Sequence, residues 1–478
     1  MTALVGLDVG TTGVKALAVS TGGEVLGRAE DPYGFETPRP GWAEQDPESW
    51  WRGAEAALAA LGVGDIAGIG LSGQMHGLVL LDAEERLLRP AILWNDQRTG
   101  AECDEIERLV GGRARLVELT GNRALPGFTA PKLLWVRRHE PDVYKRIAHV
   151  LLPKDYLRLR LTGERAIDAA DASGTLLFDV ARRRWSEELL AALEVPAGWL
   201  PPVLESPEVS GRTTDGTRVA AGAGDQAAGA LGVGVDRVGP LSVVLGTSGV
   251  VFAALPGYAA DPEGRVHAFC HAVPGGWHAM GVMLSAAGSL RWLRDAVAPG
   301  EPFAALTAEA ERWGPGTEGL AFLPYLAGER TPHVDPDARG AFVGLSLRHD
   351  RGALVRAVLE GVAYALRDSL ELIRGLGVEP ESARVSGGGS RSELWLRIVA
   401  SVLDLPLERT AAEEGAAYGA ALLGGVAAGV FGDVHEAVAA TVRVTGAVEP
   451  EPAWREAYAD GYARFRELYP ALRPLEAT

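Results

Sequence analysis

The chain has little of what marks a secreted, membrane-bound or nucleic-acid-binding protein. Its 478 residues include two cysteines, Cys103 and Cys270, which lie far apart and predict reduced thiols in a cytoplasmic protein. No apolar run reaches the length of a membrane helix, and the N-terminus lacks the basic region of a signal peptide. Acidic residues outnumber basic ones by 63 to 46, which argues against nucleic acid and anionic membranes as partners.

Two common nucleotide-binding signals and a zinc site are also excluded. No glycine precedes a lysine, so the phosphate-binding loop of Walker-type NTPases is absent. Residues 68–73 match G-x-G-x-x-G, but a strand pattern follows where a dinucleotide site needs a helix. His267, Cys270, His271 and His278 cluster without zinc spacing, and strand alternation turns them to opposite faces, so we expect structural roles for them.

What the sequence does contain is an α/β pattern in two halves. A strand, the turn Gly10–Gly13 and a second strand open the chain, and residues 241–255 repeat this arrangement around Gly246–Gly249. Strands alternate with amphipathic helices in both halves, as in the helix predicted before Gly375. The pattern predicts two similar domains, residues 1–235 and 236–478, and a chance match between two common hairpin turns is the alternative.

The first turn follows an acid on a strand. Phosphate needs convergent N–H and O–H donors, which the turn could supply together with Thr11, Thr12 and Lys15. Asp8 would then lie beside a phosphate cradle as a ligand of Mg²⁺. The alternative is a structural acid that accepts hydrogen bonds from the amides of its own turn.

Two further glycine-rich turns carry polar side chains. Asp225 lies in "GAGDQAAGA", where small neighbours leave space around one carboxylate, and it is either a helix cap or a general base that faces a cleft. Gly387, Gly388, Gly389 and Ser390 follow a strand and are predicted to open a helix, a position typical of nucleotide or phosphate binding. A tightly packed turn is the alternative.

A last group of polar side chains lies next to apolar strands in the first half. Such a group could hydrogen-bond to a sugar and stack on it. The alternatives are a structural histidine and a buried ion pair beneath an aromatic lid. The residues are Gln74, His76, Trp94, Asn95, Asp96 and Arg98.

Taken together, these segments resemble the FGGY family of carbohydrate kinases nearly from end to end. The family's order is kept by "GLDVGTTGVKA", "SGQMHG", "RPAILWNDQR", "GDQAAGA", "LGTSGV", "FLPYLAGERTPH" and "VSGGGSRSELW". "GFTAPKLLWVRRH" fits the first family signature, and "GAFVGLSLRHDRGALVRAVLE" fits the start of the second except at Ala353. The resemblance implies two actin-like ATPase (ribonuclease-H-like) domains with ATP and sugar in the cleft between them.

The resemblance also implies a role for each candidate residue. Asp225 would be the catalytic base, and Asp8 would hold Mg²⁺ near the transferred phosphate. The sugar contacts would be Gln74, Met75, His76, Trp94, Asn95, Asp96, Arg98 and Asp225. The ATP contacts would be Thr11, Thr12, Lys15, Gly246, Thr247, Ser248, Gly387, Gly388, Gly389 and Ser390.

The activity that the resemblance implies is ATP-dependent phosphorylation of a ketose, D-xylulose, at O5. The alternatives are a kinase for another sugar or polyol, such as ribulose or glycerol, and a non-catalytic actin-like nucleotide switch or sugar-binding regulator. The presence of both Asp8 and Asp225 favours an enzyme, because a regulator could lose the base. The oligomeric state is left open, with a homodimer as one candidate.

Overall fold

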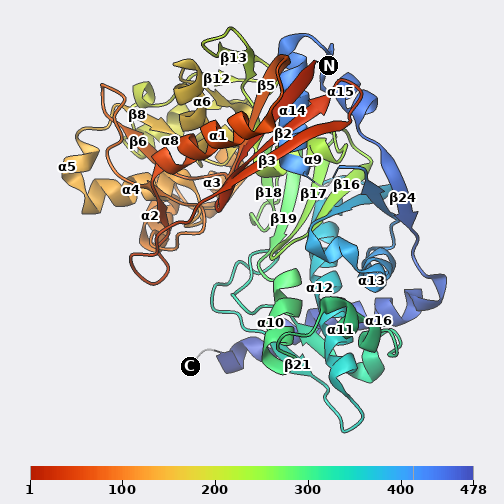
Figure 1. The fold of residues 1–478 in the computed structure, drawn as a ribbon. Coiled ribbons are helices and arrows are strands. Elements are labelled where there is room, and N and C mark those ends of the chain that lie inside the picture. The colour runs from red at the N-terminus through yellow and green to blue at the C-terminus, as the bar shows by residue number, and fades with distance from the viewer. Residues whose placement is uncertain (1, 413, 477–478) are drawn as a thin grey trace.

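The computed structural model describes residues 2–412 and 414–476. Figure 1 shows two lobes, each built on a sheet with helices against it. Both sheets have seven strands. The predicted α/β class is therefore confirmed.

The sheet of the first half carries buried, apolar inner strands. Its strands are β1 (Ala3–Val9), β2 (Gly13–Ser20), β3 (Val25–Pro32), β5 (Ile66–Gly73), β13 (Val209–Arg212), β14 (Arg218–Ala220) and β15 (Ala223–Gly224). Their order is β13-β14-β5-β1-β2-β3, with β15 also paired to β5. Strands β1 to β3 form an antiparallel meander, and β5 runs parallel to β1, so that Asp8 lies in register with Ser72 and Lys15.

The sheet of the second half repeats this topology. Its strands are β16 (Pro240–Leu245), β17 (Gly249–Leu255), β18 (His267–Cys270), β19 (Trp277–Met283), β22 (Ser382–Ser386), β23 (Leu407–Thr410) and β24 (Val444–Val448). The order is β18-β19-β17-β16-β22-β23-β24, in which β16, β17, β19 and β18 are antiparallel to one another in turn and β22 is parallel to β16. The two hairpins recognised in the sequence thus occupy the same place in two related sheets.

The remaining elements are helices and short strand pairs. The helices of the first half are α1 (Pro47–Leu61), α2 (Gly100–Leu109), α3 (Arg113–Thr120), α4 (Thr129–His139), α5 (Pro141–Tyr144), α6 (Pro153–Thr162), α7 (Ala169–Ser173), α8 (Glu187–Ala192) and α9 (Asp225–Gly232). Those of the second half are α10 (Ala287–Val297), α11 (Phe303–Ala310), α12 (Arg351–Arg374), α13 (Glu393–Leu403), α14 (Gly415–Ala428), α15 (Val434–Thr441) and α16 (Arg455–Glu476). The short pairs are β4 (Glu44–Gln45) with β7 (Ala91–Ile92), β6 (Val79–Leu81) with β8 (His149–Leu151), β9 (Ile167–Asp168) with β12 (Val203–Leu204), β10 (Phe178–Asp179) with β11 (Arg184–Trp185), and β20 (Ala321–Leu323) with β21 (Ala341–Val343).

Helix ends follow the capping residues of the sequence. The Asp350 side chain accepts a hydrogen bond from the Ala353 amide, and α12 runs from there to the predicted end at Gly375. Residues 387–390 follow β22 and precede the next helix, as predicted. A 3₁₀ turn, η3 (Gly388–Arg391), intervenes, and α13 begins at Glu393 because the Ser392 side chain caps it.

Helix α14 belongs to the second half of the chain but packs on the first sheet (Figure 1). A Cβ atom built on Gly70 would lie 1.7 Å from the carbonyl oxygen of Ala420, and one on Gly6 would lie 1.8 Å from that of Ala417. Gly68 approaches the same helix in the same way. These glycines let the helix backbone contact β1 and β5 directly. Gly68 and Gly70 of the G-x-G-x-x-G match at residues 68–73 are thus explained by helix packing and not by a dinucleotide site.

Long apolar helices are not a feature of this fold. Within residues 2–412 and 414–476, none is both long and apolar enough to cross a membrane.

The close approach of α14 is open to a stability test. Gly70→Ala places a methyl group against the Ala420 carbonyl, so we expect the free energy of unfolding to fall by about 1–3 kcal/mol or more, seen as a lower midpoint of thermal unfolding. Gly64→Ala is the matched control, because nothing lies within 4 Å of a Cβ built there. Equal midpoints for the two variants would contradict the contact.

Candidate functional site

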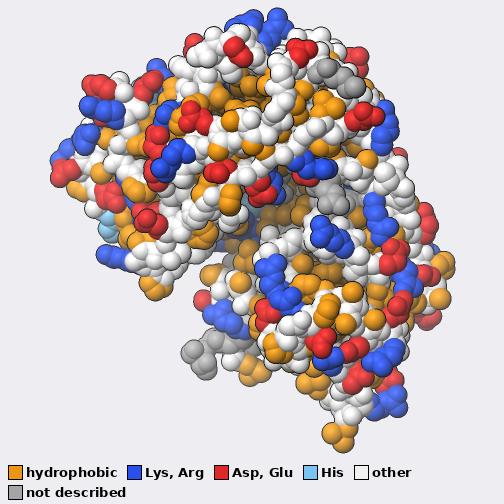
Figure 2. Space-filling view, in the orientation of Figure 1, with side chains coloured by type: hydrophobic (Ala, Val, Ile, Leu, Met, Phe, Trp, Pro, Cys, Tyr) orange, Lys and Arg blue, Asp and Glu red, His pale blue; other side chains and the backbone are white. Residues whose placement is uncertain are grey.

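A cavity of about 250 Å³ lies between the two sheets. Figure 2 shows the surface hollowed where the two lobes meet. Both halves line the cavity, and five predicted site residues are among the lining: Met75, His76, Trp94, Asp225 and Ser248. Leu125, Gly127, Phe128, Gln226, Val250, His267, Met280, Val282 and Arg330 complete it.

Asp225 is the acid of the cavity. It is the first residue of α9 and follows Gly224 at the end of β15, so the turn presents its carboxylate to the cavity. Burial, and after it the negative charge of Asp8, raise the pKa of Asp225 to about 7. A carboxyl group with this pKa changes protonation near neutral pH, as a general base must.

Asp8 lies near the end of β1, close enough for its charge to act on Asp225. Its Oδ1 atom is buried and has no hydrogen-bond partner in the parts of the chain that the structure describes. Burial raises the pKa of this carboxyl group, and the positive charge of Lys15 opposes the rise. An unpartnered carboxylate oxygen suits a hard divalent cation such as Mg²⁺, so the site fits that ion.

A network of hydrogen bonds between polar side chains fixes the turn Gly10–Gly13. Thr11 Oγ1 donates to Gln74 Oε1 over 3.2 Å and accepts from Trp94 Nε1 over 3.0 Å. Gln45 Nε2 donates to the Thr11 carbonyl over 3.0 Å. Gln74 is thus buried behind the turn and does not line the cavity, while the Thr12 side chain is exposed.

The turns of the second half lie side by side. A Cβ on Gly387 would be 2.7 Å from the Leu245 carbonyl and 3.0 Å from the Gly246 amide, and Gly387 has a φ of 88°, which favours glycine. Gly388 and Thr247 are exposed beside them, while Gly389 is buried and Ser390 Oγ donates to the Gly387 carbonyl over 2.7 Å. The structure therefore brings the two predicted phosphate turns of this half together.

His76 reaches the cavity from a constrained backbone. Its φ is 68°, an uncommon value for a residue other than glycine, and its Nδ1 lies 2.6 Å from the Gly174 carbonyl. Lys132 Nζ, on α4, donates to the His76 carbonyl over 2.9 Å. Burial lowers the pKa of His76 to about 3, so the ring is neutral, with Nδ1 as donor and Nε2 as acceptor.

Asp96 and Arg98, which follow Trp94, form a buried ion pair beneath an aromatic ring, which was the alternative to a sugar contact. Asp96 is fully buried, accepts from the Ala43 amide over 2.6 Å and pairs with Arg98 over 2.7 Å. The Arg98 guanidinium lies 3.6 Å from the centre of the Trp42 ring. Asp96, Arg98 and Asn95 do not line the cavity, and their sugar contact stays a prediction.

His267 and Arg330 are among the lining residues that were not predicted as site residues. His267 was expected to be structural, yet it faces the cavity while its Nδ1 lies 3.0 Å from Asn122 Oδ1. Arg330 lies in "GERTPH", where an arginine between apolar segments was the available signal. Both cysteines are free thiols, and both are buried.

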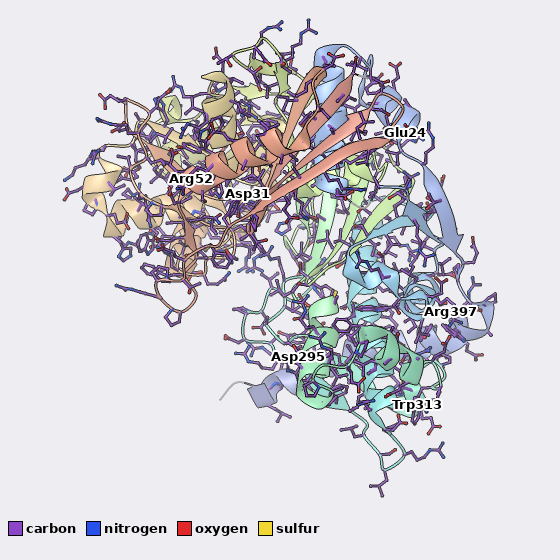
Figure 3. The ribbon with its side chains drawn as sticks, in the orientation of Figure 1. Glu24, Asp31, Arg52, Asp295, Trp313 and Arg397 are labelled. Atoms are coloured by element: carbon purple, nitrogen blue, oxygen red, sulfur yellow. The ribbon has the colours of Figure 1, made fainter. Side chains whose placement is uncertain are left out.

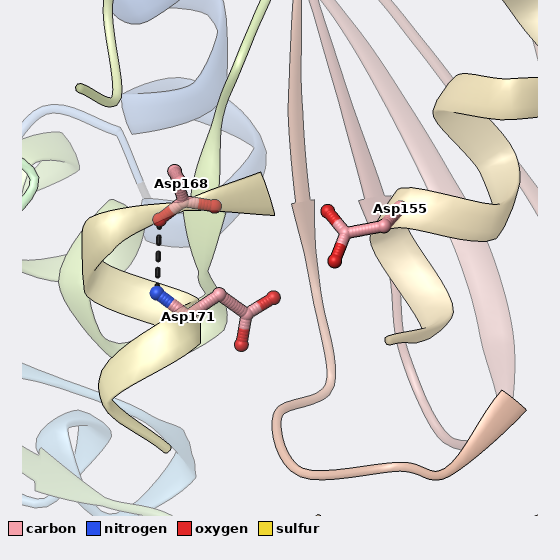
Figure 4. Close-up of side chains that lie close together, drawn as sticks. All are labelled: Asp155, Asp168 and Asp171. Atoms are coloured by element: carbon pink, nitrogen blue, oxygen red, sulfur yellow. Dashed lines mark hydrogen bonds between the residues drawn. The ribbon is translucent and has the colours of Figure 1, made fainter. Parts of the chain in front are cut away.

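A group of buried aspartates lies behind the cavity: Asp155, Asp168 and Asp171 (Figure 4). Lys154 Nζ is 2.7 Å from both Asp155 and Asp168 and 3.5 Å from Asp171. The ammonium group therefore lies among the three carboxylates, and Arg158 adds a second positive charge 2.7 Å from Asp155. We assign this group to the packing of α6 against β9 and α7.

Comparison with known proteins places these features in context. Models of the N-terminal and C-terminal domains of the FGGY family of carbohydrate kinases match residues 3–234 and 241–428. The xylulose kinase of Escherichia coli (strain K12) is 44% identical over 487 residues, covering 99% of this chain and 100% of its own, and that of Bacillus subtilis (strain 168) is 36% identical, covering 99% and 97%. The crystal structure of xylulose kinase from Rhodospirillum rubrum superposes with a TM-score of 0.92 at 35% identity and covers both chains fully.

The electrostatic coupling of the two acids can be measured directly. Asp8→Asn removes a negative charge that raises the Asp225 pKa, so the titration midpoint of Asp225 should fall below its value of about 7 in the unaltered protein. Carboxyl-detected NMR of isotope-labelled protein gives this midpoint. Asp31→Asn is the control, because Asp31, on β3 (Figure 3), does not act on Asp225. An equal midpoint in both variants would contradict the coupling.

Proposed function

Because the chain belongs to the FGGY family of carbohydrate kinases, we propose that it transfers the γ-phosphoryl group of ATP to O5 of a ketopentose, D-xylulose. The chain is an enzyme of two actin-like ATPase domains, as its sequence predicted. The observation that carries the proposal is Asp225, an acid with a pKa of about 7 in a cavity that both domains line.

The choice of sugar is supported by the relatives. Those named above are xylulose kinases and match this chain over nearly its whole length. A kinase for ribulose or glycerol has no comparable support among them. A non-catalytic regulator is disfavoured because Asp225 keeps its place in the cavity and Asp8 lies near it.

Asp225 acts as the general base in this reaction. It takes the proton of the O5 hydroxyl as O5 attacks the γ-phosphorus of ATP. The bond between O5 and phosphorus forms while the bond to the oxygen that bridges the β- and γ-phosphates breaks, and ADP leaves. Placing the cavity between two domains holds the hydroxyl and the phosphate in one orientation.

Asp8 and the glycine-rich turns serve the phosphates. Asp8 would hold Mg²⁺, which when bound neutralises charge on the phosphates. The turn Gly10–Gly13 would donate from the first domain, and the adjacent turns at Gly246 and Gly387 from the second. Thr11, Thr12, Lys15, Thr247, Ser248 and Ser390 would complete this set.

We also place the domain boundary between residues 235 and 236, between the end of one family match at 234 and the start of the other at 241. We propose a cytoplasmic location, because the two cysteines lie far apart in the sequence. A homodimer is one candidate for the oligomeric state.

Replacing the base tests the proposed chemistry. Asp225→Asn keeps the shape of the side chain but removes the proton acceptor, so kcat should fall by at least about 10²-fold. In the unaltered enzyme kcat/KM should fall as the pH drops below about 7, because Asp225 is then protonated. A coupled ADP-release assay measures both, and Asp295→Asn, an exposed acid on α10 (Figure 3), is the control. Near-normal turnover of Asp225→Asn would rule out this role.

His76 should contribute to sugar binding. His76→Ala removes the Nε2 acceptor from the cavity, so KM for the ketose should rise about tenfold, in line with the loss of one hydrogen bond, while KM for ATP stays unchanged. His149→Ala, on β8 outside the cavity, is the control. A change confined to ATP would place His76 in the wrong part of the site.

A further inference from the structure

Arg330 is the only lysine or arginine among the cavity residues in the described part of the chain. Its backbone is fixed, because its amide donates to Glu329 Oε1 over 2.7 Å and its carbonyl accepts from the Val334 amide over 2.6 Å. No hydrogen bond or ion pair joins its guanidinium group to another residue within 2–412 and 414–476. The group is thus held at the cavity with its five N–H donors unused.

The two histidines of the cavity present acceptors. His76 donates from Nδ1 to the Gly174 carbonyl, which leaves Nε2 as an acceptor. The amide nitrogen of Asn122 donates to two backbone carbonyls, so its Oδ1 must accept from His267 Nδ1. His267 Nε2 is therefore an acceptor as well.

These acceptors suit the hydroxyl groups of a sugar, and Asp225 suits the hydroxyl that reacts. Donors are scarcer. Trp94 Nε1 already donates to Thr11 Oγ1, and Ser248 and Gln226 can both donate and accept. Arg330 alone among the lining side chains is a donor that cannot accept and is not already engaged.

The chemistry of the proposed substrate calls for such a donor. In a 2-ketopentose the furanose ring closes through O5, so a molecule with O5 free to be phosphorylated is in the open-chain form. Its C2 then carries a ketone oxygen, which only accepts hydrogen bonds. The corresponding pentitols carry at C2 a hydroxyl group, which can also donate.

We propose that Arg330 donates hydrogen bonds to the ketone oxygen of the open-chain ketose and so sets the preference of the site for ketoses over polyols. This inference rests on the proposed function. The position of Arg330 supports it, because its positive charge lowers the pKa of both His76 and His267 and so lies at the histidine end of the cavity. Arg330 is a specificity-determining residue in this account, and Asp225 remains the base.

The test compares D-xylulose with xylitol and D-arabinitol, the two pentitols formed by reducing its C2. Arg330→Met should lower kcat/KM for the ketose by about 10- to 100-fold, the effect of losing a charge-assisted hydrogen bond. The kcat/KM of the pentitols, or their inhibition constants against the ketose where they are not phosphorylated, should change much less. Arg330→Lys keeps a donor that cannot accept and should restore part of the preference, whereas Arg330→Gln should not. KM for ATP should stay unchanged throughout.

Arg265→Met is the matched control, because Arg265 precedes the same region of the cavity wall but is paired with Asp261 outside the cavity. Thermal unfolding establishes that each variant folds. If Arg330→Met does not fold, Arg330→Lys is compared with the unaltered enzyme instead. Equal losses for ketose and pentitols, or a raised KM for ATP, would overturn the inference. Failure of the proposed function is a separate result: the unaltered enzyme would then not phosphorylate the ketose.

Discussion

At Gly6, Gly68 and Gly70 no side chain separates the first sheet from α14, and this contact between backbones sets how α14, from the second half of the chain, lies on the sheet of the first half. The same helix crosses α9, where a Cβ on Gly419 would lie 1.9 Å from the Ala228 carbonyl. Asp225 begins α9, so the proposed base is carried by a helix that packs against α14. Small residues at these crossings thus let α9 and α14 take the positions that place Asp225.

The cavity combines two acids, Asp8 nearby and Asp225 in its lining, with a cationic side chain, Arg330. Asp8 and Asp225 raise the free energy of each other's charged form, and burial adds to this, so the site favours a bound cation and a transferable proton. The neutral histidines present hydrogen-bond acceptors to the cavity, and the charged Arg330 presents donors. In our proposal the acids serve the reaction, and the histidines and Arg330 serve the choice of sugar.

Local patterns were enough to predict the two sheets, their hairpins and the acids Asp8 and Asp225, because each acid lies next to a turn whose small residues are adjacent in sequence. Other features depend on residues far along the chain. The placement of Asp96 and Arg98 is decided by the Ala43 amide and the Trp42 ring, and that of His267 by Asn122. A sequence pattern shows which residues are polar. Their hydrogen-bond and ring partners lie far away in the sequence and are known only from the fold.

The position of α14 also bears on how the polypeptide matures during translation. The face of β1 and β5 that this helix covers is made from the first 73 residues, but its cover ends at Ala428. When the first domain leaves the ribosome, that face is still open, and its hydrophobic core cannot close. Contacts of such long sequence separation slow folding, because the loop between them must be ordered first. The two domains are therefore coupled as a folding unit, although each has a sheet of its own.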